Sequence, residues 1–348
     1  MKKSFAEIGT FSLPMLAAVV CASTALAVPR VARSARMCAD PVSGRPVFVL
    51  DFDGVLCDAR EAVTKSAWRT ALELWPEPLE AAAELGARAG GVRKAWVGGD
   101  WSALEGHDDE GMPNWLSAKM RQLRPTVHAG YESVLLARLC AEEALASTRN
   151  ERGSRPLSAG EIQEGWEFTL RDSCLVRYGI SQGISQVELD EAYARTCDAW
   201  AAESRSSWKE AHKLYEPEAL RRCADSGAAE LYVLTNGPPT TAREVLGSER
   251  VMIDDDHVIG LTETRSKPEA LLEVQARHAE SPLRLVEDAA DSVRLVAADV
   301  RLLRWRIYYA HWGHTTPAQE AITSAFPRVR HLQRSAELEP LLLGADAS

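Results

Sequence analysis

Hydrophobic residues are spaced differently in different parts of this chain. Four short apolar runs, rich in β-branched residues, are typical of strands buried on both faces of a parallel sheet. They lie at 47–50, 231–235, 283–287 and 302–310. After residue 229 these runs alternate with stretches of helical spacing, which predict helices at 240–246, 267–278, 291–298 and 317–325. This alternation indicates a parallel sheet that is covered by helices.

The segment between the first and second apolar runs has an almost wholly helical pattern. Helices are expected at 61–75, 131–147, 159–178 and 186–212. Capping boxes, formed by Ser158 with Glu161 and by Ser185 with Glu188, begin the last two. A segment of this length between two strands must be a domain rather than a loop.

These patterns together predict an α/β fold with a large helical insertion. The core is a Rossmann-like parallel sheet built from residues 41–59 and 229–348, and a helical domain at 60–228 is inserted after the first strand. Within the insertion, Trp96 and Trp101 are candidates for contacts near the cleft between the two parts.

The first 40 residues have the composition of a targeting segment. Lys2 and Lys3 precede an apolar run that leads to Ala25-Leu26-Ala27, a suitable signal-peptidase site, and an arginine-rich stretch without acidic residues follows. We expect a two-part address to the plastid (chloroplast), with plain secretion as the alternative. The apolar run is short and contains small polar residues, so no stable membrane insertion of the mature chain is expected.

Composition and charge narrow the class of protein. The 348 residues are 46% hydrophobic and 26% charged, as in soluble globular proteins. The net charge of −10 argues against a nucleic-acid partner. The seven cysteines include no CxxC pair, which excludes a zinc knuckle and argues against a disulfide framework.

The first apolar run ends in two carboxylates. In VFVLDFDGVLCD, at 47–58, Asp51 and Asp53 follow the strand, and Gly54 allows a tight turn beside them. Two like charges this close need a proton or a cation between them, and Mg²⁺ suits such oxygen ligands. Asp51 could then attack a phosphoryl group while Asp53 transfers protons. The same pair could instead only cap a helix or bind an ion.

Two later stretches supply groups that suit phosphate. LYVLTNG at 231–237 ends a strand with the hydroxyl of Thr235, and Asn236 and Gly237 follow with their backbone N–H groups. SKPEALLEV at 266–274 predicts a helix that begins with a capping box of Ser266 and Glu269. Lys267 would thus lie at the positive end of a helix, where a cation can meet a phosphate.

A third stretch is acidic. LRLVEDAADSV at 283–293 predicts a strand followed by Glu287, Asp288 and Asp291. An acidic start of a helix has the same pattern, so the residues alone leave both interpretations open.

In this order and spacing, the four stretches resemble the haloacid dehalogenase (HAD) superfamily of phosphohydrolases. The resemblance implies that Asp51 is the nucleophile, Asp53 the acid/base, and Thr235 and Asn236 phosphate-binding residues, with Lys267 stabilising the phosphate and the nucleophile. It also implies a Mg²⁺ site at Asp51, Asp53, Glu287 and Asp288. Asp53 argues against dehalogenation, because the haloacid dehalogenases proper lack an acid at that position.

The resemblance extends to the insertion, which corresponds to the helical cap that selects the substrate in this superfamily. LRPTVHAGYESVLLARL, WPEPLE and IYYAHWGHTT look similar to HAD-like proteins of plants and algae, and this likeness covers most of residues 46–333.

The implied function is a Mg²⁺-dependent phosphatase, which hydrolyses a small phosphorylated metabolite through an aspartyl-phosphate intermediate. Two alternatives stay open. The same residues could serve a phosphomutase of the beta-phosphoglucomutase type, or the chain could be a plastid interaction protein that keeps the fold without turnover. The full set of Asp51, Asp53, Thr235, Lys267 and Asp288 favours an enzyme.

Overall fold

The computed structural model describes residues 44–86, 102–148, 156–262 and 265–344. The chain forms two units, Met1–Pro41 and Val42–Ser348, and all described residues belong to the second. The predicted targeting segment, Trp96 and Trp101 lie outside the described residues.

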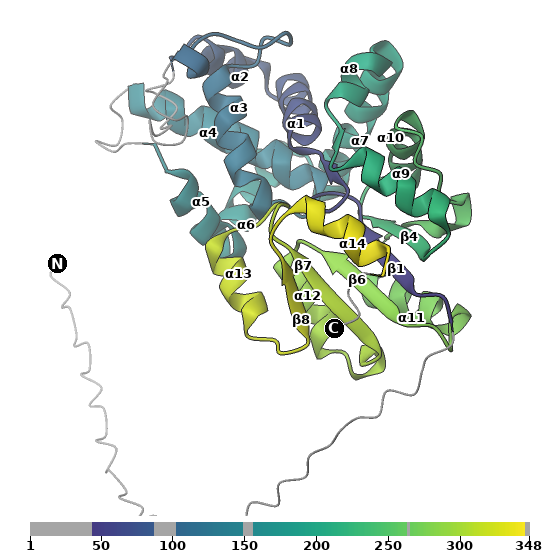
Figure 1. The fold of residues 1–348 in the computed structure, drawn as a ribbon. Coiled ribbons are helices and arrows are strands. Elements are labelled where there is room, and N and C mark those ends of the chain that lie inside the picture. Colours follow the sequence, from purple (N-terminus) through teal and green to yellow (C-terminus); the bar gives the residue numbers. More distant parts are fainter. Residues whose placement is uncertain (1–43, 87–101, 149–155, 263–264, 345–348) are drawn as a thin grey trace, which may run out of the picture. The chain divides into compact units, whose positions relative to one another are not determined.

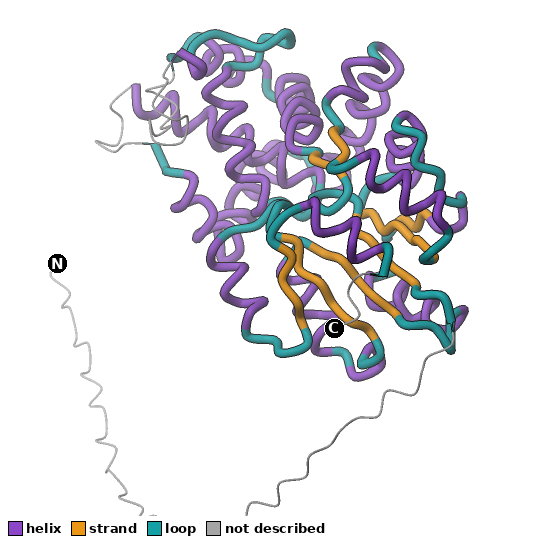
Figure 2. The backbone as a smooth tube through the Cα atoms, viewed as in Figure 1, coloured by secondary structure: helices purple, strands orange, loops and turns teal. Residues whose placement is uncertain are grey.

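Six parallel strands form one sheet in the order β5-β4-β1-β6-β7-β8, which confirms the predicted parallel sheet (Figures 1 and 2). The strands are β1 Val47–Asp51, β4 Glu230–Thr235, β5 Val258–Gly260, β6 Leu283–Glu287, β7 Trp305–Ala310 and β8 Val329–Leu332. β1 is central, with β4 and β6 as its neighbours, so three of the predicted site segments lie on adjacent strands.

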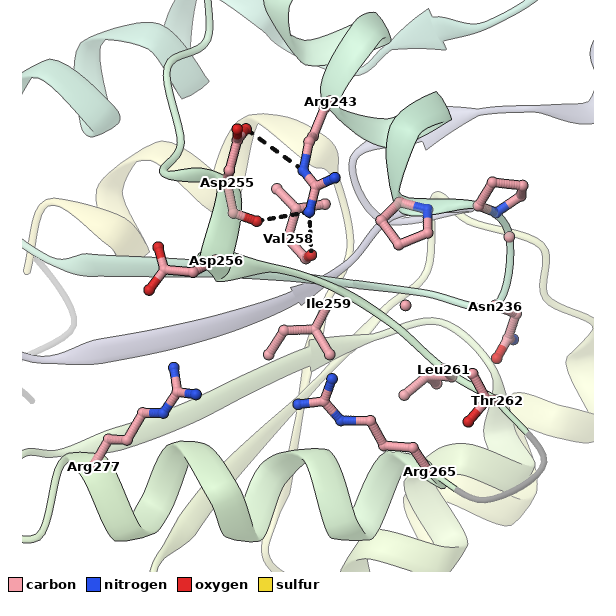
Figure 3. Close-up of a pocket in the computed structure, with 14 residues that line it drawn as sticks. Asn236, Arg243, Asp255, Asp256, Val258, Ile259, Leu261, Thr262, Arg265 and Arg277 are labelled. Carbon is pink, nitrogen blue, oxygen red and sulfur yellow. Dashed lines mark hydrogen bonds and ion pairs between the residues drawn. The ribbon is translucent and has the colours of Figure 1, made fainter.

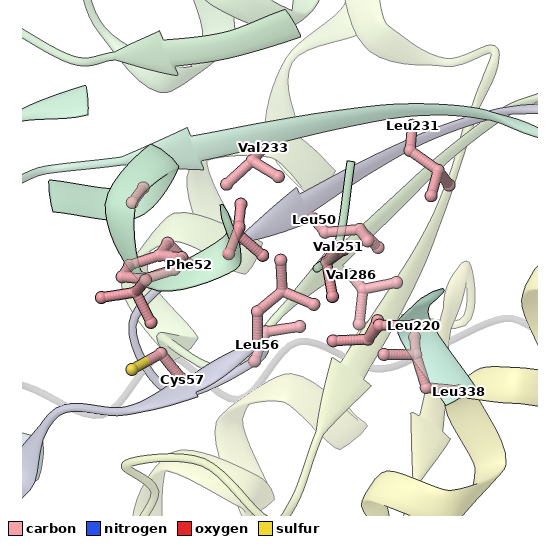
Figure 4. Close-up of a cluster of buried hydrophobic side chains, with 14 of the residues drawn as sticks. Leu50, Phe52, Leu56, Cys57, Leu220, Leu231, Val233, Val251, Val286 and Leu338 are labelled. Atoms are coloured by element: carbon pink, nitrogen blue, oxygen red, sulfur yellow. The ribbon is translucent and has the colours of Figure 1, made fainter. Parts of the chain in front are cut away.

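Alternate residues of the strands pack on opposite faces of the sheet. In β1, Phe48 and Leu50 contribute to one hydrophobic cluster, and Val47 and Val49 contribute to another. Figure 4 shows the first of these clusters, in which Leu50 and residues of neighbouring strands share the core with Leu220 and Leu338 from helices. Because both faces are covered, the central strand β1 is apolar up to Asp51 without a polar alternation.

Helices cover the sheet on both faces. The first cluster is covered by α9 Pro217–Ser226, α10 Pro239–Ser248 and α14 Leu338–Leu342. The second is covered by α11 Lys267–Arg277 and α12 Ala290–Ala298, while α13 Pro317–Ser324 packs beside α12. The elements α9, α14, β5 and β8 were not predicted from the sequence; α14 is short, and β5 and β8 are the short edge strands of the sheet.

The segment between β1 and β4 forms a helical layer with its own hydrophobic core (Figure 2). Its helices are α1 Arg60–Leu74, α2 Pro76–Ala83, α3 Asn114–Leu123, α4 Gly130–Thr148, α5 Ala159–Gly165, α6 Arg171–Cys174, α7 Gln186–Glu203 and α8 Arg205–Glu210. Trp68, Trp115 and Trp166 are buried in this core. In the described part of the chain, no helix combines the length and apolar character needed to cross a membrane.

A small antiparallel sheet joins this helical layer to the large sheet. It pairs β2 Cys57–Asp58 with β3 Lys213–Leu214, and the Tyr215 N–H donates to the Leu56 carbonyl at 2.8 Å. The helix α9, which follows β3, packs against α14 and the large sheet. The chain passes from α8 through β3 to α9 between residues 210 and 217, and the expected domain boundary at 228 stays a prediction.

The predicted helix caps and helix ends are confirmed in part. Both capping boxes of the insertion, at Ser158 and at Ser185, are present. The box expected at Ser266 is wrong, because its side chain makes no capping hydrogen bond, although Lys267 is the first residue of α11 as expected. The helix expected to run to 212 ends at Glu203, where Ser204 leaves helical geometry.

Candidate active site

Three adjacent strands end at the same level of the sheet. In β1, Asp51 lies opposite Leu234, one residue before Thr235, and Leu50 lies opposite Val286, one residue before Glu287. The polar residues that follow these strands therefore meet at one edge. In open parallel sheets this carboxyl edge, where the chain turns to either side, is the usual place for a ligand.

Three buried carboxylates and one buried amine meet there. Ligand oxygens of Asp51, Glu287 and Asp288 lie within 4.8 Å of one another. The Lys267 Nζ donates to Asp51 Oδ1 at 2.5 Å and also to Glu287 Oε2. The sequence prediction that these four residues form one site is consistent with this geometry, and their chemical roles stay predictions.

The charges in this cluster do not balance. Burial, followed by the Glu287 charge, raises the pKa of Asp51 well above its ordinary value. The same two causes raise the pKa of Asp288 to about 7. Burial alone would lower the pKa of Lys267, but the Asp51 and Glu287 carboxylates outweigh it and raise that pKa. Three acids with one amine thus leave an excess of negative charge in a buried site, which a cation would relieve.

Glu287 has an evident structural task. Its Oε1 accepts hydrogen bonds from the backbone N–H groups of Asp288, at 3.1 Å, and Ala289, at 2.9 Å, while its Oε2 accepts from Lys267. It therefore fixes both the turn after β6 and the amine that contacts Asp51. Of the three buried carboxylates, only Glu287 has both oxygens in hydrogen bonds, whereas Asp51 Oδ2 and Asp288 Oδ1 accept none from the described residues.

Two glycines make room for Asp288. Gly54 has φ of +95°, and a Cβ there would lie 1.9 Å from Asp288 Oδ2. A Cβ on Gly313 would lie 2.5 Å from Asp288 Cβ and 2.6 Å from the Gly54 carbonyl oxygen. The turn after β1 and the loop after β7 therefore enclose this carboxylate from two sides, and a side chain at either glycine would displace it.

The loop after β7 adds a residue that sequence reasoning missed. The backbone N–H of His314 donates to Asp288 Oδ2 at 2.7 Å. Burial, and then the charge of Arg124, lower the pKa of His314 to about 4, so its ring is neutral at neutral pH. Asp288 is thus held by a backbone group. The available signal was a Gly-His pair just after an apolar strand.

The HxxH of His311 and His314 does not form a metal pair in this structure. The His311 ring contacts His331, with Nε2 and Nδ1 2.6 Å apart, and its other nitrogen lies 3.2 Å from Glu320. Asp291 also lies apart from the acidic cluster, because its exposed carboxylate accepts from Arg294 at 2.9 Å.

The buried acids and Lys267 line a cavity of about 440 Å³, and the remaining predicted residues border this cavity too. Asp53 is partly buried, and Thr235 is buried with its Oγ1 accepting from the Gly237 N–H at 3.0 Å. Asn236 is exposed at the cavity wall. The floor of the cavity is made by the strand ends. Its walls come mainly from the helical layer, with Thr240 and Glu244 of α10 and Gln319 of α13 as further lining residues, so a bound molecule would contact both parts of the chain.

A second cavity, of about 640 Å³, lies along the edge strand β5 (Figure 3). Its lining includes Arg243, which donates to the carbonyls of Asp255 at 2.8 Å and Val258 at 3.3 Å. None of the three buried carboxylates borders it. The first cavity is therefore the one that brings acids, amine and hydroxyl together.

Comparison with known proteins gives matches only among solved structures. No protein-family model matches the chain, and no curated protein does. A protein assigned as a phosphoglycolate phosphatase from Lactobacillus delbrueckii is 11% identical, with a TM-score of 0.43 over 86% of this chain and 99% of that one. A predicted phosphatase from Clostridium acetobutylicum is 12% identical, with a TM-score of 0.43 over 87% and 100%.

A third match is a hydrolase of the haloacid dehalogenase-like family from Streptococcus pneumoniae. It is 12% identical, with a TM-score of 0.39 over 84% of this chain and 96% of that one. Since all three identities are 12% or lower, a function has to be argued from the site itself.

Because Asp288 packs closely against Gly54 and Gly313, adding a methyl group at Gly313 should destabilise the fold. Gly313→Ala should lower the free energy of unfolding by about 1–3 kcal/mol, because the new Cβ meets Asp288 and the Gly54 backbone. Gly247→Ala is the control, because a Cβ there, within helix α10, has no neighbour within 4 Å. It should raise stability by about 0.5–1 kcal/mol. Denaturant unfolding measures both, and a harmless Gly313→Ala would contradict the described packing.

The raised pKa of Asp288 predicts a pH-dependent stability. In the folded chain this carboxyl keeps a proton up to about pH 7, whereas its ordinary pKa is 3.8. Stability is therefore lost as pH rises from about 4 to 7, at about 1.4 kcal/mol per unit of pKa shift, and the loss is constant above. Asp288→Asn removes this cost and still offers an oxygen to the His314 N–H.

Melting temperatures in the presence of a chelator provide the measurement. The gain from Asp288→Asn over the unsubstituted chain should be at least about 3 °C larger at pH 8 than at pH 5. Asp225→Asn, at an exposed aspartate of α9, should show no such trend. A gain that is independent of pH would mean that Asp288 is not held in a site of excess negative charge.

Proposed function

We propose that this chain is a Mg²⁺-dependent phosphatase of the haloacid dehalogenase type, which hydrolyses a small phosphorylated metabolite through an aspartyl-phosphate intermediate. One observation carries the proposal. A buried lysine, Lys267, contacts Asp51 and Glu287 at the ends of adjacent strands, with Asp288 beside them. In this arrangement Lys267 fixes the position of the Asp51 carboxylate, and the excess negative charge can be offset by a divalent cation.

The donor set fits Mg²⁺. The cluster offers only carboxylate oxygens, which are the ligands that Mg²⁺ prefers, and it carries more negative charge than Lys267 offsets. Asp51 and Asp288 would hold the ion, with Asp53 as a further predicted ligand and Glu287 mainly positioning Lys267. When bound, the ion would supply charge neutralisation between the acids and the phosphate.

Asp51 serves as the nucleophile. One oxygen of its carboxylate attacks phosphorus, the bond between phosphorus and the ester oxygen breaks, and an aspartyl phosphate forms on Asp51. A water molecule then attacks phosphorus, which releases inorganic phosphate and restores the carboxylate. Lys267 supports both steps, because its amine is held by Asp51 and Glu287 and carries the positive charge that the phosphate oxygens require.

Asp53 and the end of β4 complete the reaction. Asp53 borders the same cavity two residues after Asp51, so its carboxyl can protonate the leaving oxygen and later take a proton from water. The Thr235 hydroxyl and Asn236 lie on the same wall and can donate hydrogen bonds to phosphate oxygens.

The two aspartates should have separable effects. Asp51→Asn removes the phosphoryl acceptor and should abolish turnover of every ester. Asp53→Asn removes proton transfer, which contributes ~10²–10⁴-fold, and should slow alkyl phosphates far more than 4-nitrophenyl phosphate, whose leaving oxygen needs little protonation. Steady-state kcat with Mg²⁺ on both ester types makes the comparison.

Asp225→Asn, remote from the cavity, should keep full activity on both esters. The proposal would be abandoned if Asp51→Asn retained the turnover of the unsubstituted enzyme. Including a phosphosugar with its bisphosphate in the same assays separates a phosphatase, which releases inorganic phosphate, from a phosphomutase, which yields an isomer.

A further inference from the structure

The cavity contains one cation from the helical layer. Among the described residues that line it, only Lys267 and Arg124 are lysine or arginine. Lys267 is already paired with two carboxylates at the strand ends. Arg124 comes instead from the short turn Arg124–Thr126 that follows α3, so the insertion places a second positive charge in the site.

The guanidinium of Arg124 has an edge that is not used. Its Nη1 donates to the Val127 carbonyl at 3.0 Å, which is the only hydrogen bond of this side chain among the described residues. Its Nε is buried and has no partner in that part of the chain. A buried donor without a partner is costly, and the Nη2 of Arg124, which also donates no hydrogen bond to a described residue, can meet an oxygen of a carboxylate or phosphate.

The position of Arg124 is set by contacts on both sides of the cavity. The carbonyl of the next residue, Pro125, accepts from Gln319 of α13 at 3.3 Å, which ties this turn to the sheet. At the start of α4, a Cβ on Gly130 would lie 2.3 Å from the ring of Tyr193 in α7. The segment that carries Arg124 is thus packed closely against α7.

Arg124 lies in the same cavity as the acids at the strand ends. Asp51, Asp53 and Asp288 all line this cavity together with Arg124. Arg124 therefore approaches the reaction centre from the helical layer, whereas Lys267 approaches it from the start of α11.

We propose that Arg124 binds a second anionic group of the substrate, a carboxylate or a second phosphate, while the phosphoryl group that reacts lies at Asp51. The inference rests on the proposed phosphatase activity and narrows its substrate class to phosphate esters with two anionic ends. An ester whose second end is uncharged, called a neutral ester below, would leave the guanidinium of Arg124 without a partner and would be bound less well.

Matched esters test this inference. Phosphoglycolate and 3-phosphoglycerate carry a carboxylate at the second end, and propane-1,3-diol bisphosphate carries a second phosphate. They are compared with ethyl phosphate and glycerol 3-phosphate, whose second ends are uncharged. The unsubstituted enzyme should have a higher kcat/KM on the anionic members, and the better of the two anionic types identifies the second group. Arg124→Gln should lower kcat/KM on that type roughly 10- to 100-fold and change neutral esters less than about 3-fold.

Two further variants separate binding from structural damage. Arg124→Lys keeps the charge without the paired donors and should fall between the unsubstituted enzyme and Arg124→Gln. Arg121→Gln, at an exposed position on α3, should match the unsubstituted enzyme. Activity on the neutral esters reports whether each variant is folded.

The outcomes distinguish this inference from the proposed function. Equal losses on anionic and neutral esters, or no preference for anionic esters in the unsubstituted enzyme, would overturn the role of Arg124 while leaving the phosphatase intact. If the unsubstituted enzyme with Mg²⁺ hydrolysed none of the esters, 4-nitrophenyl phosphate included, the proposed function itself would fail.

Discussion

The contact of Lys267 with Asp51 and Glu287 is the interaction on which the arrangement of this site depends. It joins the start of α11 to the ends of β1 and β6, and all three side chains are buried. Loss of the amine would leave two buried carboxylates without a positive charge beside them, which is far more costly than loss of an exposed ion pair. The geometry is therefore strict, and in the proposed enzyme the unbalanced charge that remains would attract a divalent cation.

The two parts of the chain contribute different things to the cavity. The strand ends supply the acids and the Thr235 hydroxyl, and the start of α11 supplies the amine, all beside a sheet that is buried on both faces. The helical layer supplies Arg124 and much of the remaining wall, on a segment tied to α13 through Pro125. In the proposed enzyme, chemistry thus belongs to the sheet and selection of the substrate to the insertion. The small β2–β3 sheet is where the chain passes between them.

The sequence was sufficient for the parts of the structure that local patterns determine. Apolar runs located β1, β4 and β6, and the resemblance of the residues at their ends to the haloacid dehalogenase superfamily implied one site that contains Asp51, Thr235 and Glu287. Tertiary contacts decide the rest. The capping box expected at Ser266 does not form. No local sequence pattern predicts that Gly313 borders Asp288 or that the buried Nε of Arg124 lacks a partner. The edge strand β5 has three residues, too few for a periodic signal.

The most direct test of this account is chemical trapping of the phosphoenzyme during turnover. The enzyme would be quenched with acid while it hydrolyses an ester in the presence of Mg²⁺, and then treated with borohydride, which reduces an aspartyl phosphate to homoserine. Peptide mass spectrometry would locate the change. The account predicts homoserine at position 51, dependent on substrate and absent from Asp53. Rapid turnover with no modification at Asp51 under conditions that trap a known aspartyl phosphate, or modification at another carboxylate, would contradict it.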